Sequence, residues 1–191
     1  MISLKIFIKG SYLDLSRKNL TLKELENKFK WNCEGLLKLN LLGNRLIEFP
    51  FRIFSAANLT ELDISCCELQ EIPKEFGEKL VQLRYFFCNQ NQLKNLPDSL
   101  QNLNLLIILS IGYNFLKEIP SWLKKLTNLE SLNVEHNRLE TLPAHLKECT
   151  KLQELKANHN SIQVISKALV SLKRLELFNL ESNMLPRSLV G

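Results

Sequence analysis

The hydrophobic positions of this chain recur in a pattern about 23 residues long. The clearest copy spans residues 129–143 and reads LESLNVEHNRLETLP. Leu132 and Val134 alternate with polar neighbours, which predicts a short strand with one buried face. After Pro143, apolar residues recur at three-residue spacing (Leu146, Cys149) toward the next strand. Each copy therefore predicts a strand, a turn and a compact return segment.

One polar position follows the strand in each copy. Anchored on it, seven copies are spaced by 23, 24, 23, 23, 23 and 23 residues. A side-chain amide both donates and accepts hydrogen bonds, so a row of such residues can satisfy backbone groups of adjacent turns. We interpret the row as a structural ladder. Its members are Asn44, Cys67, Asn91, Asn114, Asn137, Asn160 and Asn183.

The pattern L-x-x-L-x-L-x-x-N-x-L resembles the leucine-rich repeat family, and the resemblance covers nearly the whole chain. It implies an α/β solenoid: a right-handed superhelix curved into a horseshoe, with a parallel sheet on the concave face. Short helices, 3-10 turns or extended segments are implied on the convex face. The physical interpretation agrees, because one copy cannot bury its apolar side chains alone whereas stacked copies can.

Two regions are expected. Residues 1–35 form an N-terminal cap, with a strand over residues 1–8 and an irregular first repeat that contains a helix over residues 22–31. Residues 36–191 form seven repeats, the last incomplete and without a cap. We therefore expect further chain or a partner to cover the C-terminal edge. Gly77 is expected to let its longer repeat absorb one extra residue.

The register also predicts which side chains point out of the concave face. Large apolar and aromatic groups gather on two adjacent repeats, and such clusters favour a protein-binding surface over a merely solvated patch. Two adjacent histidines with nearby charged groups form a polar wall beside them. The predicted protein-binding residues are Tyr85, Phe87, Ile108, Tyr113, Phe115 at the rim, Glu135, His136, Glu154, Lys156 and His159.

Catalysis and cofactor binding find no support in the sequence. His136 and His159, with Glu135 and Glu154 nearby, lack the thiolate or third histidine that would complete a tetrahedral metal site. The chain has six glycines and no phosphate-binding glycine motif or nucleophile elbow. We expect a protein that is not an enzyme and binds no cofactor or metal.

Composition and charge exclude further classes of protein. The net charge is +5 from 25 basic and 20 acidic residues, without an arginine-aromatic stripe, which argues against nucleic-acid binding. The basic residues of the C-terminal half fall on the convex side. They form either a solvated face or a surface that contacts an acidic partner or an anionic membrane. No apolar run approaches the roughly 20 residues of a transmembrane helix.

The cysteines bear on the cellular compartment. There are five, an odd number, scattered through core positions, which we interpret as reduced thiols and hence as a cytoplasmic location. The glycosylation sequons at Asn19 and Asn58 are then read as chance matches.

Repeats that end in Leu-Pro or Ile-Pro resemble intracellular arrays of Ras-pathway scaffolds. The resemblance implies a non-enzymatic protein-protein interaction module or scaffold in intracellular signalling. Its partner would be a protein on the concave face, such as a small GTPase or a phosphatase-type signalling protein. Two alternatives remain open: a targeting or regulatory segment of a larger enzyme (phosphatase, kinase or adenylyl cyclase), and an immune-receptor fragment, which would require a signal peptide or flanking cysteines.

Overall fold

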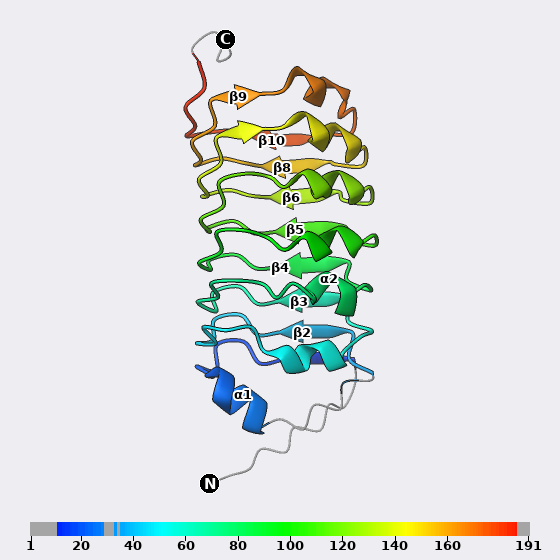
Figure 1. Ribbon diagram of the computed structural model, residues 1–191, viewed down its shortest axis with the longest axis vertical. Helices are drawn as coiled ribbons and strands as arrows, with labels where there is room; N and C mark the ends of the chain where they lie inside the picture. Colours follow the sequence, from blue (N-terminus) through cyan, green and yellow to red (C-terminus); the bar gives the residue numbers. More distant parts are fainter. Residues whose placement is uncertain (1–10, 29–32, 34, 187–191) are drawn as a thin grey trace.

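Short parallel strands stacked along one axis form the main sheet of the molecule (Figure 1). The computed structural model describes residues 11–28, 33 and 35–186. Eight strands follow one another in chain order, and each first residue pairs with the first residue of the next strand. The predicted solenoid with a parallel sheet is therefore confirmed. The strands are β1 (Tyr12–Asp14), β2 (Lys38–Asn40), β3 (Glu61–Asp63), β4 (Tyr85–Phe87), β5 (Ile108–Ser110), β6 (Ser131–Asn133), β8 (Glu154–Lys156) and β10 (Leu177–Asn179).

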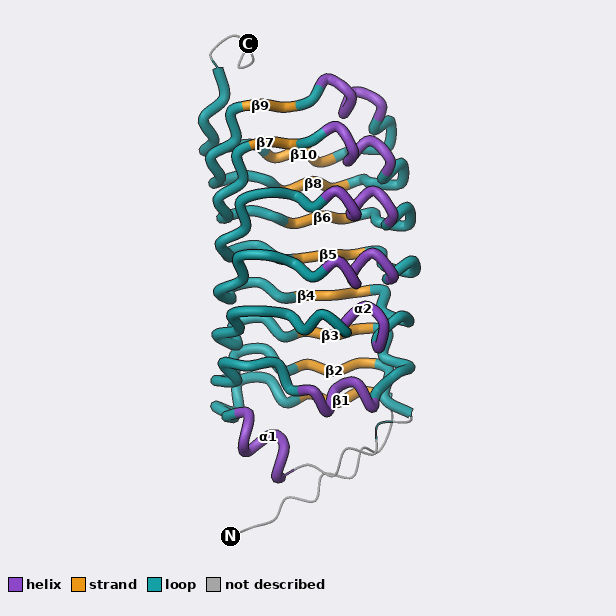
Figure 2. The backbone as a smooth tube through the Cα atoms, viewed as in Figure 1, coloured by secondary structure: helices purple, strands orange, loops and turns teal. Residues whose placement is uncertain are grey.

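Short helical segments return the chain on the opposite side of the stack (Figure 2). Most are single 3-10 turns preceded by proline, whose fixed φ suits a helix start. Ser166 replaces proline in the last one, and its hydroxyl accepts the Ala168 N–H at 3.3 Å. The segments are η1 (Phe51–Ser55), α2 (Phe76–Lys79), η2 (Asp98–Asn102), η3 (Ser121–Lys125), η4 (Ala144–Glu148) and η5 (Lys167–Ser171).

The first repeat carries α1 (Leu22–Lys28), within the segment predicted to be helical. The predicted capping strand over residues 1–8 lies outside the described residues, as do residues 29–32 and 187–191.

A second, smaller sheet lies on the side of the helical turns. It consists of β7 (Thr141–Leu142) and β9 (Val164–Ile165), which pair in parallel. The hydrophobic pattern of the sequence does not predict this sheet. Two-residue strands are too short to show an alternation of apolar and polar positions.

The core is one continuous cluster between the large sheet and the helical turns. The central residue of each inner strand is fully buried, as at Leu62, Phe86 and Leu132. In β10, the edge strand of the described sheet, Leu177 and Phe178 remain 41% and 42% exposed. Cover of this edge by further chain or a partner stays a prediction.

The asparagine row bonds successive repeats together. The Oδ1 of Asn137 accepts the Leu116 N–H at 2.9 Å, and its Nδ2 donates to the carbonyls of Ile111 and Val134, both at 3.1 Å. The asparagines at the other ladder positions make equivalent bonds. Each of these side chains satisfies polar groups that stacking would otherwise bury unpaired.

Cys67 makes only half of these bonds. Its thiol donates to the Leu41 carbonyl at 3.3 Å, as an asparagine amide would, but the sulfur accepts no N–H from Leu46. Among the described residues, no side chain takes that acceptor role. Instead Ile47 donates to the Cys67 carbonyl and adopts a φ of 64°. A β-branched residue in the left-handed region is a genuine outlier.

We expect Cys67→Asn to stabilise the chain by about 1 kcal/mol, because Asn supplies the missing acceptor for the Leu46 N–H. The measurement is the denaturant midpoint followed by circular dichroism. Cys88→Asn is the matched control: Cys88 is also buried but directly follows β4 and is not in the ladder, so an amide there should destabilise. A Cys67→Asn variant less stable than wild type would contradict the assignment.

Gly77 has a different role from the one expected. It lies inside α2, with no left-handed φ, and a Cβ there would lie 1.9 Å from the Ser99 carbonyl oxygen. Its N–H donates to the Ser99 hydroxyl at 3.1 Å. Gly77 is therefore needed for the close approach of α2 to η2, and not for an unusual turn.

Candidate functional site

The sheet surface, defined as the outward face of the eight-stranded sheet, was predicted to be the binding face. Its first row follows the strand register, so Glu61, Tyr85, Ile108 and Ser131 are successive neighbours. Tyr85 and Ile108 are half-buried, as is Phe87 two residues further along β4. The register thus brings three of the predicted apolar binding residues together.

Ion pairs bound this apolar region on both sides. On one side Lys38 Nζ lies 2.7 Å from Glu61 Oε2. On the other, Glu154 accepts the Ser131 hydroxyl at 2.6 Å and contacts Lys156 Nζ at 2.8 Å. The contact with Lys156, and to a smaller extent the hydrogen bond from Ser131, lowers the pKa of Glu154. This carboxylate is therefore charged at neutral pH. The apolar patch therefore has a polar rim, the arrangement found at protein interfaces.

Glu135 is held by amides. Its two carboxylate oxygens accept Asn133 Nδ2 at 3.1 Å and Asn158 Nδ2 at 3.2 Å. Gly112 gives it room, since a Cβ at Gly112 would lie 3.0 Å from the Glu135 Cγ. Glu135 is thus a fixed acidic group beside the histidines.

The residue before each ladder position has a left-handed backbone. Except in the last described repeat, its N–H donates to a carbonyl of the next repeat, as from Tyr113 to Glu135 at 2.8 Å and from His136 to Asn158 at 3.0 Å. Glycine adopts this conformation freely, whereas other residues do so at a cost. The row, which we call the left-handed row, consists of Gly43 (φ 70°), Cys66 (54°), Gln90 (52°), Tyr113 (56°), His136 (48°), His159 (52°) and Ser182 (57°), with Arg17 (54°) at the corresponding position of the irregular first repeat.

Three rings of the left-handed row stack into one column. The ring centroids of Tyr113 and His136 are 4.0 Å apart with planes 13° from parallel, and those of His136 and His159 are 4.1 Å apart at 16°. Tyr113 is 43% exposed and forms the end of the column nearest the apolar patch along the chain. The ring column, Tyr113–His136–His159, therefore joins the predicted aromatic and histidine groups into one surface.

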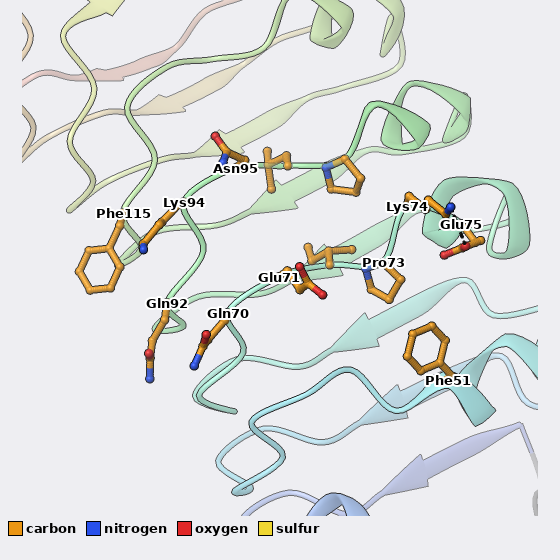
Figure 3. Close-up of a pocket in the computed structure, with 13 residues that line it drawn as sticks. Phe51, Gln70, Glu71, Pro73, Lys74, Glu75, Gln92, Lys94, Asn95 and Phe115 are labelled. Atoms are coloured by element: carbon orange, nitrogen blue, oxygen red, sulfur yellow. Dashed lines mark ion pairs between the residues drawn. The ribbon is translucent and has the colours of Figure 1, made fainter.

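Phe115 does not join this surface. Its N–H donates to the Leu93 carbonyl of the preceding repeat, whereas that of Tyr113 donates to the following repeat. The Arg138 guanidinium lies 4.6 Å from the Phe115 ring centroid. Phe115 instead lines a groove on the back of the stack, the side away from the large sheet (Figure 3).

The site offers no place for a metal ion within the described residues. The nearly parallel rings of His136 and His159 cannot direct two ring nitrogens at one point between them. Over the described ranges, no three histidine, cysteine or acidic side chains gather closely enough to hold an ion. Nor is any described helix long and apolar enough to cross a bilayer.

The cysteine side chains behave as small core groups. All five thiols are free; Cys33, Cys67, Cys88 and Cys149 are buried, and Cys66 is half-buried. Burial raises the pKa of the Cys67 and Cys149 thiols to about 11. Thiols of this kind are unreactive because the thiolate is the reactive species.

Comparison with known proteins finds relatives and structural neighbours that carry repeats. Bovine (Bos taurus) osteomodulin is 31% identical over 102 residues, covering 53% of this chain and 24% of osteomodulin. The LRR ectodomain of the plant membrane receptor kinase GASSHO1/SCHENGEN3 from Arabidopsis thaliana superposes with a TM-score of 0.71 at 31% identity, covering 79% of this chain and 19% of that one. The Arabidopsis receptor kinase HAESA gives a TM-score of 0.76 at 26% identity, covering 91% and 30%. The chain thus spans about a quarter of the relatives it matches.

These comparisons contradict the predicted cytoplasmic location. Osteomodulin is a secreted extracellular matrix protein, and the GASSHO1/SCHENGEN3 match is to an ectodomain. The prediction rested on unpaired cysteines, but a buried free thiol packs as an apolar group and does not report the compartment.

The match to a family model decides the classification. The model describes a leucine-rich repeat region and matches residues 44–189, which is more than half of the chain. The matched region includes every ladder position and the strands β3 to β10. With its stacked parallel strands and asparagine ladder, the chain belongs to the leucine-rich repeat family.

Proposed function

We propose that this chain is a recognition module that binds a protein or peptide partner on the sheet surface. The binding residues are the apolar patch, the ring column and the polar groups beside them: Tyr85, Phe87, Ile108, Tyr113, Glu135, His136, Glu154, Lys156 and His159. The observation that carries the proposal is the ring column, because three stacked and partly exposed rings give a rigid contact area made of adjacent ring edges. Ordering such side chains on binding costs little entropy.

Structural neighbours support a polypeptide ligand. GASSHO1/SCHENGEN3 is in complex with Casparian strip integrity factor 2, and HAESA with the peptide hormone IDA and the co-receptor SERK1. The Ras-pathway partner and the intracellular signalling role expected from the sequence depended on a cytoplasmic location, so they are not part of this proposal. Phe115 is also left out, because it lines the groove on the back of the stack.

A second candidate is a targeting or regulatory repeat segment within a larger enzyme. The observation in its favour is that one structural neighbour is the repeat ectodomain of a membrane receptor kinase. Both candidates use the same sheet surface for recognition, and they differ in what else the protein does.

The test replaces the aromatic residues of the site. We expect Tyr85→Ala/Phe87→Ala/Tyr113→Ala to recover partner proteins about tenfold less well than wild type in quantitative affinity capture, because aromatic side chains dominate interface energies. Val164→Ala/Val170→Ala is the control: it trims two exposed apolar side chains that belong neither to the sheet surface nor to the groove that Phe115 lines. Circular dichroism checks that each variant is folded. Equal recovery by wild type and the folded triple variant would show that the sheet surface is not the binding site.

A further inference from the structure

The groove on the back of the stack lies between the repeats anchored on Cys67 and Asn91 (Figure 3). We call it the back groove. Its volume is about 790 Å³, and its walls are formed by residues 70–75 and by residues 92 and 94–97, two segments that run extended as far as Pro73 and Pro97 before the helical turns begin. Phe115 and Phe51 stand at opposite ends of it. A long groove with extended backbone on both sides has the shape of an extended peptide.

The backbone of these walls is free to pair. Residues 71–72 lie four and five positions after Cys67, and residues 95–96 lie at the same positions after Asn91. In two later repeats the equivalent residues form β7 and β9, which pair in parallel. Within the described part of the chain, the N–H groups of residues 71–72 and 95–96 donate to no protein acceptor. The same backbone positions are thus paired in one part of the stack and open in another.

The two repeats are in close contact elsewhere. At their helical turns Gly77 brings α2 against η2, with the Gly77 N–H bonded to the Ser99 hydroxyl. The Cys67 repeat is also the one of 24 residues. The groove is therefore a local opening between extended segments whose ends are fixed by packed helical turns, and not a general separation of the two repeats.

The side chains around the groove indicate what it takes. Glu71 and Glu75 are balanced by Lys74 and Lys94, so the walls favour neither a strongly acidic nor a strongly basic ligand. Phe51 is 57% exposed and offers an apolar contact at one end. The free backbone groups between these ends can bind a main chain but do not select its side chains.

We propose that the back groove binds an extended peptide segment of a partner protein, with little net charge and an apolar side chain that contacts Phe51. Its main chain pairs with the free groups that face the groove, which by the β7–β9 register include the N–H groups of Ile72 and Asn95, as in other cases of strand addition. This site is on the opposite side of the stack from the sheet surface, so it can be confirmed or refuted independently of the proposed function.

A random peptide library displayed on phage, selected on the intact chain, supplies the probe. The strongest binder is synthesised with a fluorescent label and titrated by anisotropy. We expect Asn95→Pro, which removes a free N–H that faces the groove, to weaken binding about tenfold or more. Glu118→Pro is a matched control, because Glu118 lies four positions after Asn114, as Asn95 does after Asn91, but outside the groove. N-methylation of alternate peptide amides should weaken binding by a similar factor.

Three outcomes would overturn the proposal: no peptide is selected, Asn95→Pro and Glu118→Pro bind the peptide alike, or N-methylation has no effect. Phe51→Ala serves as a second groove variant if Asn95→Pro fails to fold. Tyr113→Ala separates the two sites. A peptide whose binding is lost with Tyr113→Ala but kept with Asn95→Pro occupies the sheet surface, which would support the proposed function and refute this one.

Discussion

Gly77→Ala should destabilise the chain by about 3 kcal/mol, although alanine is the better helix former. The added Cβ would lie 1.9 Å from the Ser99 carbonyl oxygen and 2.9 Å from the Leu100 nitrogen. Both are backbone atoms, so no side-chain rotation can relieve the clash. The α2 and η2 segments must move apart, which also lengthens the hydrogen bond from the Gly77 N–H to the Ser99 hydroxyl.

The measurement is the denaturant midpoint by circular dichroism, with Gly35→Ala as the matched control. A Cβ at Gly35 would meet no atom within 4 Å, so that variant should stay within about 0.5 kcal/mol of wild type. If Gly77→Ala were as stable as Gly35→Ala, the two helical turns would not be in the close contact described above.

Asn137→Ala should cost about 3 kcal/mol, because it leaves several buried backbone groups without partners at once. The side chain accepts the Leu116 N–H and donates to the carbonyls of Ile111, Val134 and Glu135. These bonds join two repeats in the middle of the stack, where water cannot replace them.

Asn183→Ala tests this explanation with the same substitution. Asn183 makes equivalent bonds in the last described repeat but is only half-buried, so solvent can satisfy the groups it leaves. We expect a loss of about 1 kcal/mol there. Equal losses at Asn137 and Asn183, measured by urea denaturation, would mean that burial does not set the contribution of a ladder residue.

Much of the fold could be predicted from spacing. The first strand position recurs at a nearly constant interval from Lys38 to Leu177. Adding that interval is enough to predict which residues of neighbouring strands pair, including Tyr85 with Ile108. The β7–β9 pair could not be predicted in this way, since strands of two residues carry no periodic signal.

The candidate site was only partly predictable. Tyr113, His136 and His159 are spaced by 23 residues and so occupy equivalent positions in successive repeats. Tyr and His do not by themselves indicate a left-handed backbone; Gly43, at the same position of an earlier repeat, was the available signal. Phe115 was misplaced at the rim because it lies one residue past Asn114, where the chain bonds back to the preceding repeat. The cellular location was wrong because buried cysteines serve packing in any compartment.

The left-handed row separates recognition from folding. Each non-glycine residue there destabilises the folded chain by about 1 kcal/mol through its left-handed backbone. At three successive positions the residue is nevertheless one with an aromatic or imidazole ring. The core and the asparagine ladder do not depend on which side chain projects from this row. Its members can therefore diverge between related proteins, or be exchanged by design, to change what the array binds while the solenoid beneath them stays the same.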